Sequence, residues 1–288
     1  MKKKLTFGGV LLLLLLAVLI YFLLPTPEPA PAISLDQVPS YSGEPFSVLN
    51  GNIPLFTEED ITDESYEYYG DLDALNRCTI TMASIGPDLM PTEDRGAIGQ
   101  VKPTGWVTAK YDFVDGKYLY NRCHLIGFQL TGENANEQNL ITGTRYMNVD
   151  GMLPFENMVA DYIKETGNHV LYRVIPVFDG DNLVADGVTM EAWSVEDDGE
   201  GICFYVYVYN VQPGVEIDYA SGESWLAESA AESGEPTETY IANTSSKKFH
   251  DSDCAQAQSI NAENSQTFET TRSQMIAWNF TAAGCCNP

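Results

Sequence analysis

The chain has 288 residues, which allows one or two domains, and its 44% hydrophobic fraction is that of an ordinary globular protein. Its six cysteines are too few for a dense disulfide framework in a chain of this size. The formal net charge of −26, taken over the whole chain, argues against a nucleic-acid partner, because phosphate binding requires Lys and Arg. Between residues 95 and 148, however, six basic and four acidic residues give a local charge of +2, so an anionic substrate is not excluded there.

The first 24 residues predict a membrane anchor. Residues 5–24 carry no charge and are long enough to cross a bilayer core of about 30 Å. Lysines at positions 2–4 precede them, so the amino terminus is expected in the cytoplasm and the body of the chain outside the cell. The alternative is a cleaved signal peptide and a secreted protein, although the apolar region of a signal peptide is shorter, about 7–15 residues. We therefore expect a single-pass protein of the cell membrane, with a proline-rich linker over residues 25–45.

Residues 46–224 predict an α+β domain. Apolar runs predict strands at six positions: 47–49, 79–84, 117–124, 169–178, 188–195 and 202–211. Apolar residues at helical spacing predict a helix over 154–166, with Pro154 in its first turn and Gly167 just after its end. The acidic stretch 58–73 is expected to be a solvated loop or a short helix. Short turns join the last three strands, which favours antiparallel pairing.

The strand predicted at 117–124 carries two side chains suited to phosphodiester hydrolysis. Arg122 and His124 are two residues apart, so they share one face of the strand. Histidine can deprotonate water near neutral pH, and the planar guanidinium of arginine matches phosphate. Downstream, the carbonyl oxygen of Asn148 can hold Mg²⁺, which needs only one or two protein ligands. By residue type alone, structural and capping roles are the more common alternatives. His169 lies outside this group and is expected to be structural.

The run 121–148 resembles the active-site segment of the DNA/RNA non-specific endonucleases, in particular the branch of streptococcal DNA-entry nucleases and secreted DNases. The resemblance extends over about residues 46–224 and includes VKPTGW at 101–106. It implies an α+β fold with a ββα-metal nuclease core and an antiparallel sheet. The Asp-Arg-Gly-His motif of the family stands here as Asn-Arg-Cys-His at 121–124, so that only its arginine and histidine match.

The same resemblance implies roles for individual side chains. They are His124 as general base, Asn148 as magnesium ligand, Glu156 as the helix carboxylate that holds metal-bound water, Arg122 as phosphate clamp and Asn139 as polar support. The earlier Asp-Arg-Gly at 94–96 lacks the histidine, and Arg95 is expected either to contact phosphate or to lie on the surface.

The resemblance therefore implies a metal-dependent, non-specific endonuclease that acts outside the cell. Magnesium is the expected cofactor, with manganese as an alternative, and DNA is the expected substrate, with RNA as a second one. Contacts to the backbone rather than to base edges would give little sequence preference. The alternative from another class is a non-catalytic surface protein that binds nucleic acid on a decayed nuclease fold.

The last part of the chain predicts a separate small module. Residues 225–239 are acidic and small and are expected to form a linker, followed by a module over 240–288. The module resembles the Ada-type metal-binding module through Phe-His at 249–250, Cys254 and Cys-Asn-Pro at 286–288. Ala283 stands where that pattern has another cysteine, and Cys285 is next to Cys286 instead. Two alternatives stay open: a zinc site formed by His250, Cys254, Cys285 and Cys286, or a disulfide-bonded or metal-free remnant.

Overall fold

The computed structural model describes residues 33–227, 236–286 and 288. The predicted anchor at 5–24 lies outside the described residues, as does the proline-rich start of the linker. Over the described ranges, none of the helices combines the length and the apolar character that crossing a membrane requires. The described part of the predicted linker contains the short turn η1 (Leu35–Gln37), and Leu35 and Val38 pack against the sheet described next. The linker therefore becomes part of the folded domain before residue 45.

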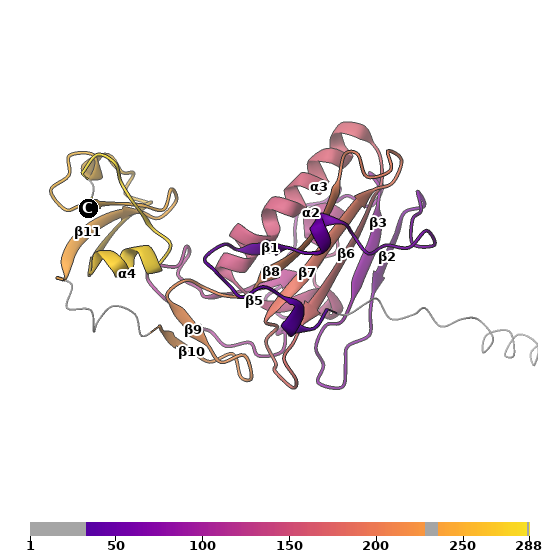
Figure 1. The fold of residues 1–288 in the computed structure, drawn as a ribbon, viewed down its shortest axis with the longest axis horizontal. Helices are drawn as coiled ribbons and strands as arrows, with labels where there is room; N and C mark the ends of the chain where they lie inside the picture. The colour runs from indigo at the N-terminus through magenta and orange to yellow at the C-terminus, as the bar shows by residue number, and fades with distance from the viewer. Residues whose placement is uncertain (1–32, 228–235, 287) are drawn as a thin grey trace, which may run out of the picture. The chain divides into compact units, whose positions relative to one another are not determined.

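A six-stranded antiparallel sheet forms the centre of the domain, in the order β1-β8-β7-β6-β3-β2 (Figure 1). Its strands are β1 (Phe46–Val48), β2 (Tyr66–Tyr69), β3 (Thr81–Ile85), β6 (Val170–Val177), β7 (Gly187–Ser194) and β8 (Cys203–Tyr209). All but β2 confirm predicted strands. Strand β2 falls within the acidic stretch predicted as a loop or short helix, and that prediction is wrong at this position. As an edge strand, β2 leaves Glu67 and Tyr68 exposed, so its sequence lacks the apolar run that marks a central strand.

Both faces of this sheet are buried, and β8 shows how. Successive side chains of a strand point to opposite faces. The three tyrosines at 205, 207 and 209 pack with Leu49 and Val177, whereas the apolar residues at 204, 206 and 208 join the main core. The strict alternation in the sequence of this strand therefore corresponds to two separate apolar clusters, one on each face of the sheet.

A ββα unit packs against this core. Strand β4 (Tyr120–His124) pairs antiparallel with β5 (Leu140–Thr144), and the chain then passes through η4 (Met147–Met152) into helix α3 (Leu153–Thr166). Figure 1 shows α3 alongside the sheet, and its buried residues Phe155, Val159 and Ile163 belong to the main core. The helix has proline in its first turn and ends at Gly167, which has a φ of 76°. The predicted helix, its cap and the α+β class with an antiparallel sheet are confirmed.

Several short elements complete the described chain. They are η2 (Asn50–Asn52), α2 (Phe128–Thr131), η3 (Glu137–Asn139) and the hairpin of β9 (Val215–Ile217) with β10 (Ser224–Leu226). The C-terminal module contains a sheet of order β13-β11-β12-β14. Its elements are β11 (Glu238–Asn243), β12 (Lys248–Asp251), η5 (Ala257–Ser259), β13 (Ser265–Thr270), α4 (Arg272–Ala277) and β14 (Thr281–Ala282). Both ends of the linker predicted at 225–239 are therefore strand residues.

Candidate functional site

A cleft of about 1110 Å³ brings most of the predicted site residues together. The predicted residues that line it are Arg95, Arg122, His124, Asn148 and Glu156. They come from the loop after β3, from β4, from η4 and from α3, so the ββα unit supplies the chemistry and a preceding loop supplies one arginine. Asn139 does not line the cleft.

His124 is held in one orientation and one tautomer. The side chain is only 6% exposed, and its Nε2 donates to the backbone oxygen of Asn134 at 2.7 Å. Because this nitrogen carries the proton, Nδ1 has the lone pair and accepts from Nη2 of Arg95 at 3.2 Å. Burial, assisted by the Arg95 charge, lowers the pKa of His124 to about 4, although the bond to Asn134 opposes this shift. The imidazole is therefore neutral at physiological pH, with Nδ1 unprotonated, and it lines the cleft.

Glu156, in the first turn of α3, is the second titratable group of the site. Burial raises the pKa of its carboxyl to about 7, and a hydrogen bond from Gln129 and the charge of Arg95 only partly oppose the shift. The carboxyl lies against Gly127, where an added Cβ would be 2.7 Å from Oε2. A larger residue at 127 would therefore displace this carboxylate from its position. A half-buried carboxyl with so little compensating positive charge fits a neighbouring cation.

Asn148 lies in η4, eight residues before Glu156, and lines the same cleft. In the described part of the chain its side-chain amide forms no hydrogen bond, so its oxygen is available. The amide oxygen and the carboxylate are hard donors of the type that Mg²⁺ or Mn²⁺ prefers. The residues present therefore fit a divalent cation between η4 and the start of α3.

The two arginines predicted for this site, Arg122 and Arg95, differ in how tightly their side chains are held. Arg122 donates from Nε to the oxygen of Val101 and from Nη2 to that of Gly99 at 3.0 Å. Its guanidinium also lies over the Trp106 ring, 4.0 Å from the centroid. Arg95 is exposed and reaches His124. Arg122 is thus a fixed positive charge in the cleft wall, and Arg95 is the arginine that contacts His124.

Asn139 acts on the backbone rather than in the cleft. It is fully buried, its Oδ1 accepts from the Ile126 amide at 2.9 Å, and its Nδ2 donates to the Ile126 oxygen at 3.0 Å. These bonds fix the chain between His124 and Gly127, which is consistent with the predicted supporting role.

The structure also accounts for the departure from the family motif at Cys123. The thiol is fully buried, and burial raises its pKa. An added Cβ at Gly143 on the neighbouring strand would lie 2.4 Å from Cys123 Sγ. Glycine at 143 therefore supplies the space that the larger residue at 123 needs. The other departure, Asn121, accepts a long hydrogen bond of 3.4 Å from Arg145.

Sequence reasoning missed several residues that shape the cleft. Trp106, Gly127, Gln129 and Arg145 all line it. The signal for Arg145 was its position three residues before Asn148, whereas nothing in the sequence identifies Gly127 as the neighbour of Glu156. The structure places His169 outside the cleft, with Nδ1 2.7 Å from Glu196 Oε1 and Nε2 3.1 Å from Ser65 Oγ.

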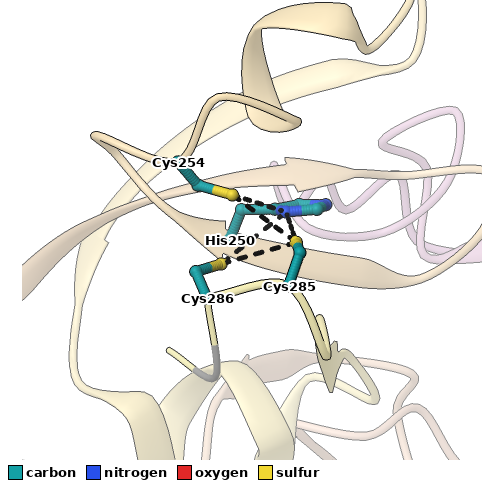
Figure 2. Close-up of side chains that lie close together, drawn as sticks. All are labelled: His250, Cys254, Cys285 and Cys286. Atoms are coloured by element: carbon teal, nitrogen blue, oxygen red, sulfur yellow. Dashed lines mark hydrogen bonds between the residues drawn. The ribbon is translucent and has the colours of Figure 1, made fainter.

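A second group of metal-binding side chains lies in the C-terminal module. Figure 2 shows His250, Cys254, Cys285 and Cys286 pointing toward one another, and their ligand atoms all lie within 4.8 Å of one another. The sulfurs of Cys254, Cys285 and Cys286 are 3.5, 3.2 and 3.8 Å from His250 Nδ1. Zinc bonds of about 2.3 Å to sulfur and 2.0–2.1 Å to nitrogen give about 3.5 Å between nitrogen and sulfur in a tetrahedron. The group therefore fits tetrahedral zinc, and Cys285 supplies the ligand that Ala283 cannot.

The thiols of this cluster are not paired as disulfides. Cys285 Sγ is 3.5 Å from Cys254 Sγ and 3.8 Å from Cys286 Sγ, compared with about 2.05 Å in a disulfide. All six cysteines of the chain are free. The hydrogen bond to His250 lowers the pKa of Cys254 to about 6, toward the thiolate form that binds metal.

A neutral histidine, an asparagine and a helix carboxylate arranged on a ββα unit define the class of ββα-metal nucleases. Residues 57–196 match the family model described as DNA/RNA non-specific endonuclease, and this part of the chain belongs to that family. A search of curated proteins found no match.

Solved structures support the same fold. NucA from Streptococcus agalactiae with magnesium bound is 24% identical and has a TM-score of 0.58, covering 67% of this chain and 92% of that one. The same protein without metal has a TM-score of 0.56, with the same identity and coverage. The Sda1 nuclease with bound zinc is 24% identical with a TM-score of 0.53, covering 64% of this chain and 97% of that one. At this identity the likeness shows the fold.

Proposed function

We propose that the chain is a metal-dependent, non-specific endonuclease that hydrolyses phosphodiester bonds of DNA, and of RNA as a second substrate, outside the cell. The observation that carries the proposal is the state of His124. It is neutral, it is oriented by the Asn134 carbonyl, and it lines a cleft that also contains Asn148 and Glu156. Such a nitrogen can accept the proton of a water molecule that attacks phosphorus.

Asn148 and Glu156 are the residues that would hold a divalent cation in the cleft. We propose magnesium, with manganese as the alternative; the NucA structure with bound magnesium and the Sda1 structure with bound zinc support a divalent cation. When bound, the cation would offset negative charge on the phosphate and on the leaving oxygen. Glu156 would be ionised in that state and would orient water.

The two arginines would interact with the phosphate in different ways. Arg95 is the better candidate for direct contact, since it is exposed and its bond to His124 is easily exchanged. If Arg95 moved to the scissile phosphate, Nδ1 of His124 would be released to act as the base. Arg122, held by two backbone oxygens and Trp106, would add a fixed charge to the wall. Both arginines would contact the sugar–phosphate backbone of the nucleic acid, and such contacts carry little sequence information.

Residues 5–24 are proposed to anchor the protein in the cell membrane with its body outside, and secretion after cleavage is the alternative. Fractionation of cells that produce the full chain separates the two, because an anchored protein stays in the membrane pellet and a cleaved one appears in the medium.

We also propose that the C-terminal cluster holds zinc as a structural ion. The ligand distances support a closed tetrahedral site, in which all four positions are filled by the protein. Such a site would contribute to folding rather than to hydrolysis. Metal analysis of the purified protein tests this directly.

The first test of the nuclease is hydrolysis of plasmid DNA and RNA by residues 33–288, with magnesium and with EDTA. We expect magnesium-dependent degradation of DNA and its loss in EDTA. The presence of His124, Asn148, Glu156 and both arginines in one cleft favours the enzyme over a binding protein on a decayed fold. A well-folded protein that retains DNA but cuts nothing with any divalent cation would support that alternative instead.

A further inference from the structure

A short hairpin between β3 and β4 forms one wall of the nuclease cleft. Lys110 and Tyr118 form an antiparallel bridge, and the Tyr111 amide donates to the Lys117 oxygen at 2.9 Å. Ala109, Asp115, Gly116 and Tyr118 of this segment all line the cleft. We call residues 109–119 the wall hairpin. An isolated two-stranded hairpin is only marginally stable in water, so its position must be fixed by other contacts.

The tip of the wall hairpin is buried in the C-terminal module. Phe113 and Val114 are 4% and 3% exposed and belong to one apolar cluster with residues of that module: Tyr240, Ala242, Phe249, Phe268, Met275 and Phe280. The Phe113 ring is stacked on Trp278, with centroids 4.6 Å apart and planes 5° from parallel. A residue of the nuclease domain is thus part of the core of the module.

A second link joins the same two regions at Asp115, beside the tip of the hairpin. Asp115 forms an ion pair of 2.7 Å with Arg145, whose own amide donates to the Leu119 oxygen. Lys247, in the turn between β11 and β12 of the module, interacts electrostatically with Asp115 as well. The apolar contacts and the charges around Asp115 hold the tip of the hairpin, and the hydrogen bond to the Leu119 oxygen holds its base.

The surface that this arrangement presents suits a single nucleic-acid strand. Tyr118 is 50% exposed, and Lys110 Nζ lies 4.4 Å from the centroid of its ring. An exposed aromatic ring offers a base a stacking partner, and a neighbouring lysine offers its phosphate a positive charge. Both side chains lie on the hairpin itself, so their position depends on where the hairpin is held.

We infer that the C-terminal module positions the wall hairpin by burying Phe113, so that Tyr118 and Lys110 receive a nucleotide that flanks the scissile phosphate. The identity of the ligand rests on the proposed nuclease function, whereas the burial of the hairpin tip does not. The module is therefore a positioning element of the substrate cleft, although none of its residues takes part in hydrolysis.

The test compares Phe113→Ala with Ile276→Ala in residues 33–288. Ile276 is a matched control because it lies on α4 of the same module but is 49% exposed. Two substrates are used: a single-stranded DNA oligonucleotide, and a small nitrophenyl phosphodiester that is too short to reach the hairpin. For Phe113→Ala we expect KM for the oligonucleotide to rise about fivefold or more, the effect of losing a base–aromatic contact. Turnover of the small ester should stay unchanged, as should both activities of Ile276→Ala.

Two further measurements keep the inference testable. Tyr118→Ala should raise the same KM while the hairpin stays resistant to trypsin, whereas Phe113→Ala should expose Lys110 and Lys117 to rapid cleavage. If Phe113→Ala changes neither KM nor trypsin resistance, or if it lowers turnover of the small ester as strongly as that of DNA, the inference is overturned. A wild-type protein that cleaves nothing would disprove the nuclease proposal, and the trypsin comparison would still test whether the module holds the hairpin.

Discussion

The nuclease cleft and the C-terminal cluster are built in opposite ways. The cleft residues come from β4, η4 and α3, and the main core supports all three of these elements. The cluster residues come from the end of β12, the turn after it and the last residues of the chain, beside a core of a few large side chains. A small core gains relatively more from a bound metal. We therefore expect the cleft to keep its shape without a cation, and the module to depend on one.

Both regions also depart from the sequence motifs of the families they resemble, and the structure accommodates the two departures in different ways. In the cleft, the cysteine at 123 is accommodated by glycine on the adjacent strand, and β4 and β5 pair in continuous register there. In the module, Cys285 replaces a ligand that the pattern places two residues earlier, so the ligating chain segment itself differs. In the sheet, a small neighbouring residue makes room for the larger side chain. In the cluster, a cysteine at a different position takes the place of the missing ligand.

The largest effect is expected for His124→Ala. Removing a general base typically costs about 10²–10⁴ in rate, so DNA hydrolysis should fall by at least that range. The measurement is kcat with magnesium, alongside a melting curve that should remain cooperative. His169→Ala is the control, because His169 lies outside the cleft. If His124→Ala keeps a tenth or more of the wild-type rate, another group is the base.

The second largest effect is expected in the other region. Cys285→Ser should reduce bound zinc from about one ion per chain to almost none, because a tetrahedral site loses one of its four ligands. The module should then become sensitive to proteases, while hydrolysis of a small phosphodiester persists. Cys203→Ser is the control, since Cys203 lies on β8, far from the cluster in sequence, and its thiol bonds to the Asn52 oxygen. Equal zinc content in both variants would remove Cys285 from the site.

Much of the fold was predictable because its signals are local. The alternation of β8 and the proline and glycine at the ends of α3 identify those elements from the sequence alone. The edge strand β2 was not predictable, since its pairing with β3 supplies the hydrogen bonds and its four residues lie within an acidic stretch. Strand β5 was also missed, because LITGT is short and contains a glycine whose purpose appears only opposite Cys123.

The site was predictable as a set of residues but not as a set of contacts. Resemblance indicated His124, Asn148 and Glu156, and the structure brings them to one cleft. The resemblance could not show that Arg122 is bound to backbone oxygens or that Arg95 bonds to His124. Both contacts depend on the path of the loop between β3 and β4. The role of Cys285 likewise depends on how the chain end folds back on β12.

A smaller effect is expected from the pH dependence of the metal-free cleft. Glu156 has a folded-state pKa of about 7, above its ordinary value of 4.5. The folded protein then binds this proton more tightly than the unfolded chain. Stability should therefore be lost as pH rises from about 4.5 to about 7, by about 3 kcal/mol at most. Magnesium favours the carboxylate, so it should raise the melting temperature more at about pH 8 than at about pH 5. Glu156→Gln should abolish this difference, and a magnesium effect that is equal at both pH values in the wild type would contradict the assignment.

The smallest effect concerns the compensation between Cys123 and Gly143. Gly143→Ala should cost about 1–3 kcal/mol, since the new methyl group meets Cys123 Sγ inside a packed core. Gly99→Ala is the control, because nothing lies within 4 Å of a Cβ at that position. In a Cys123→Gly background the same Gly143→Ala change should cost much less, which a double-mutant cycle measures from urea unfolding.

The sign of that coupling decides between two accounts of the altered motif. If the two changes couple favourably, the sheet has accepted a larger residue at 123 only because glycine stands opposite, and the geometry of His124 one residue later is preserved. If the costs simply add, Cys123 is tolerated for another reason, and Gly143 is required by the backbone or by Met147, whose sulfur lies 3.5 Å from the same added Cβ.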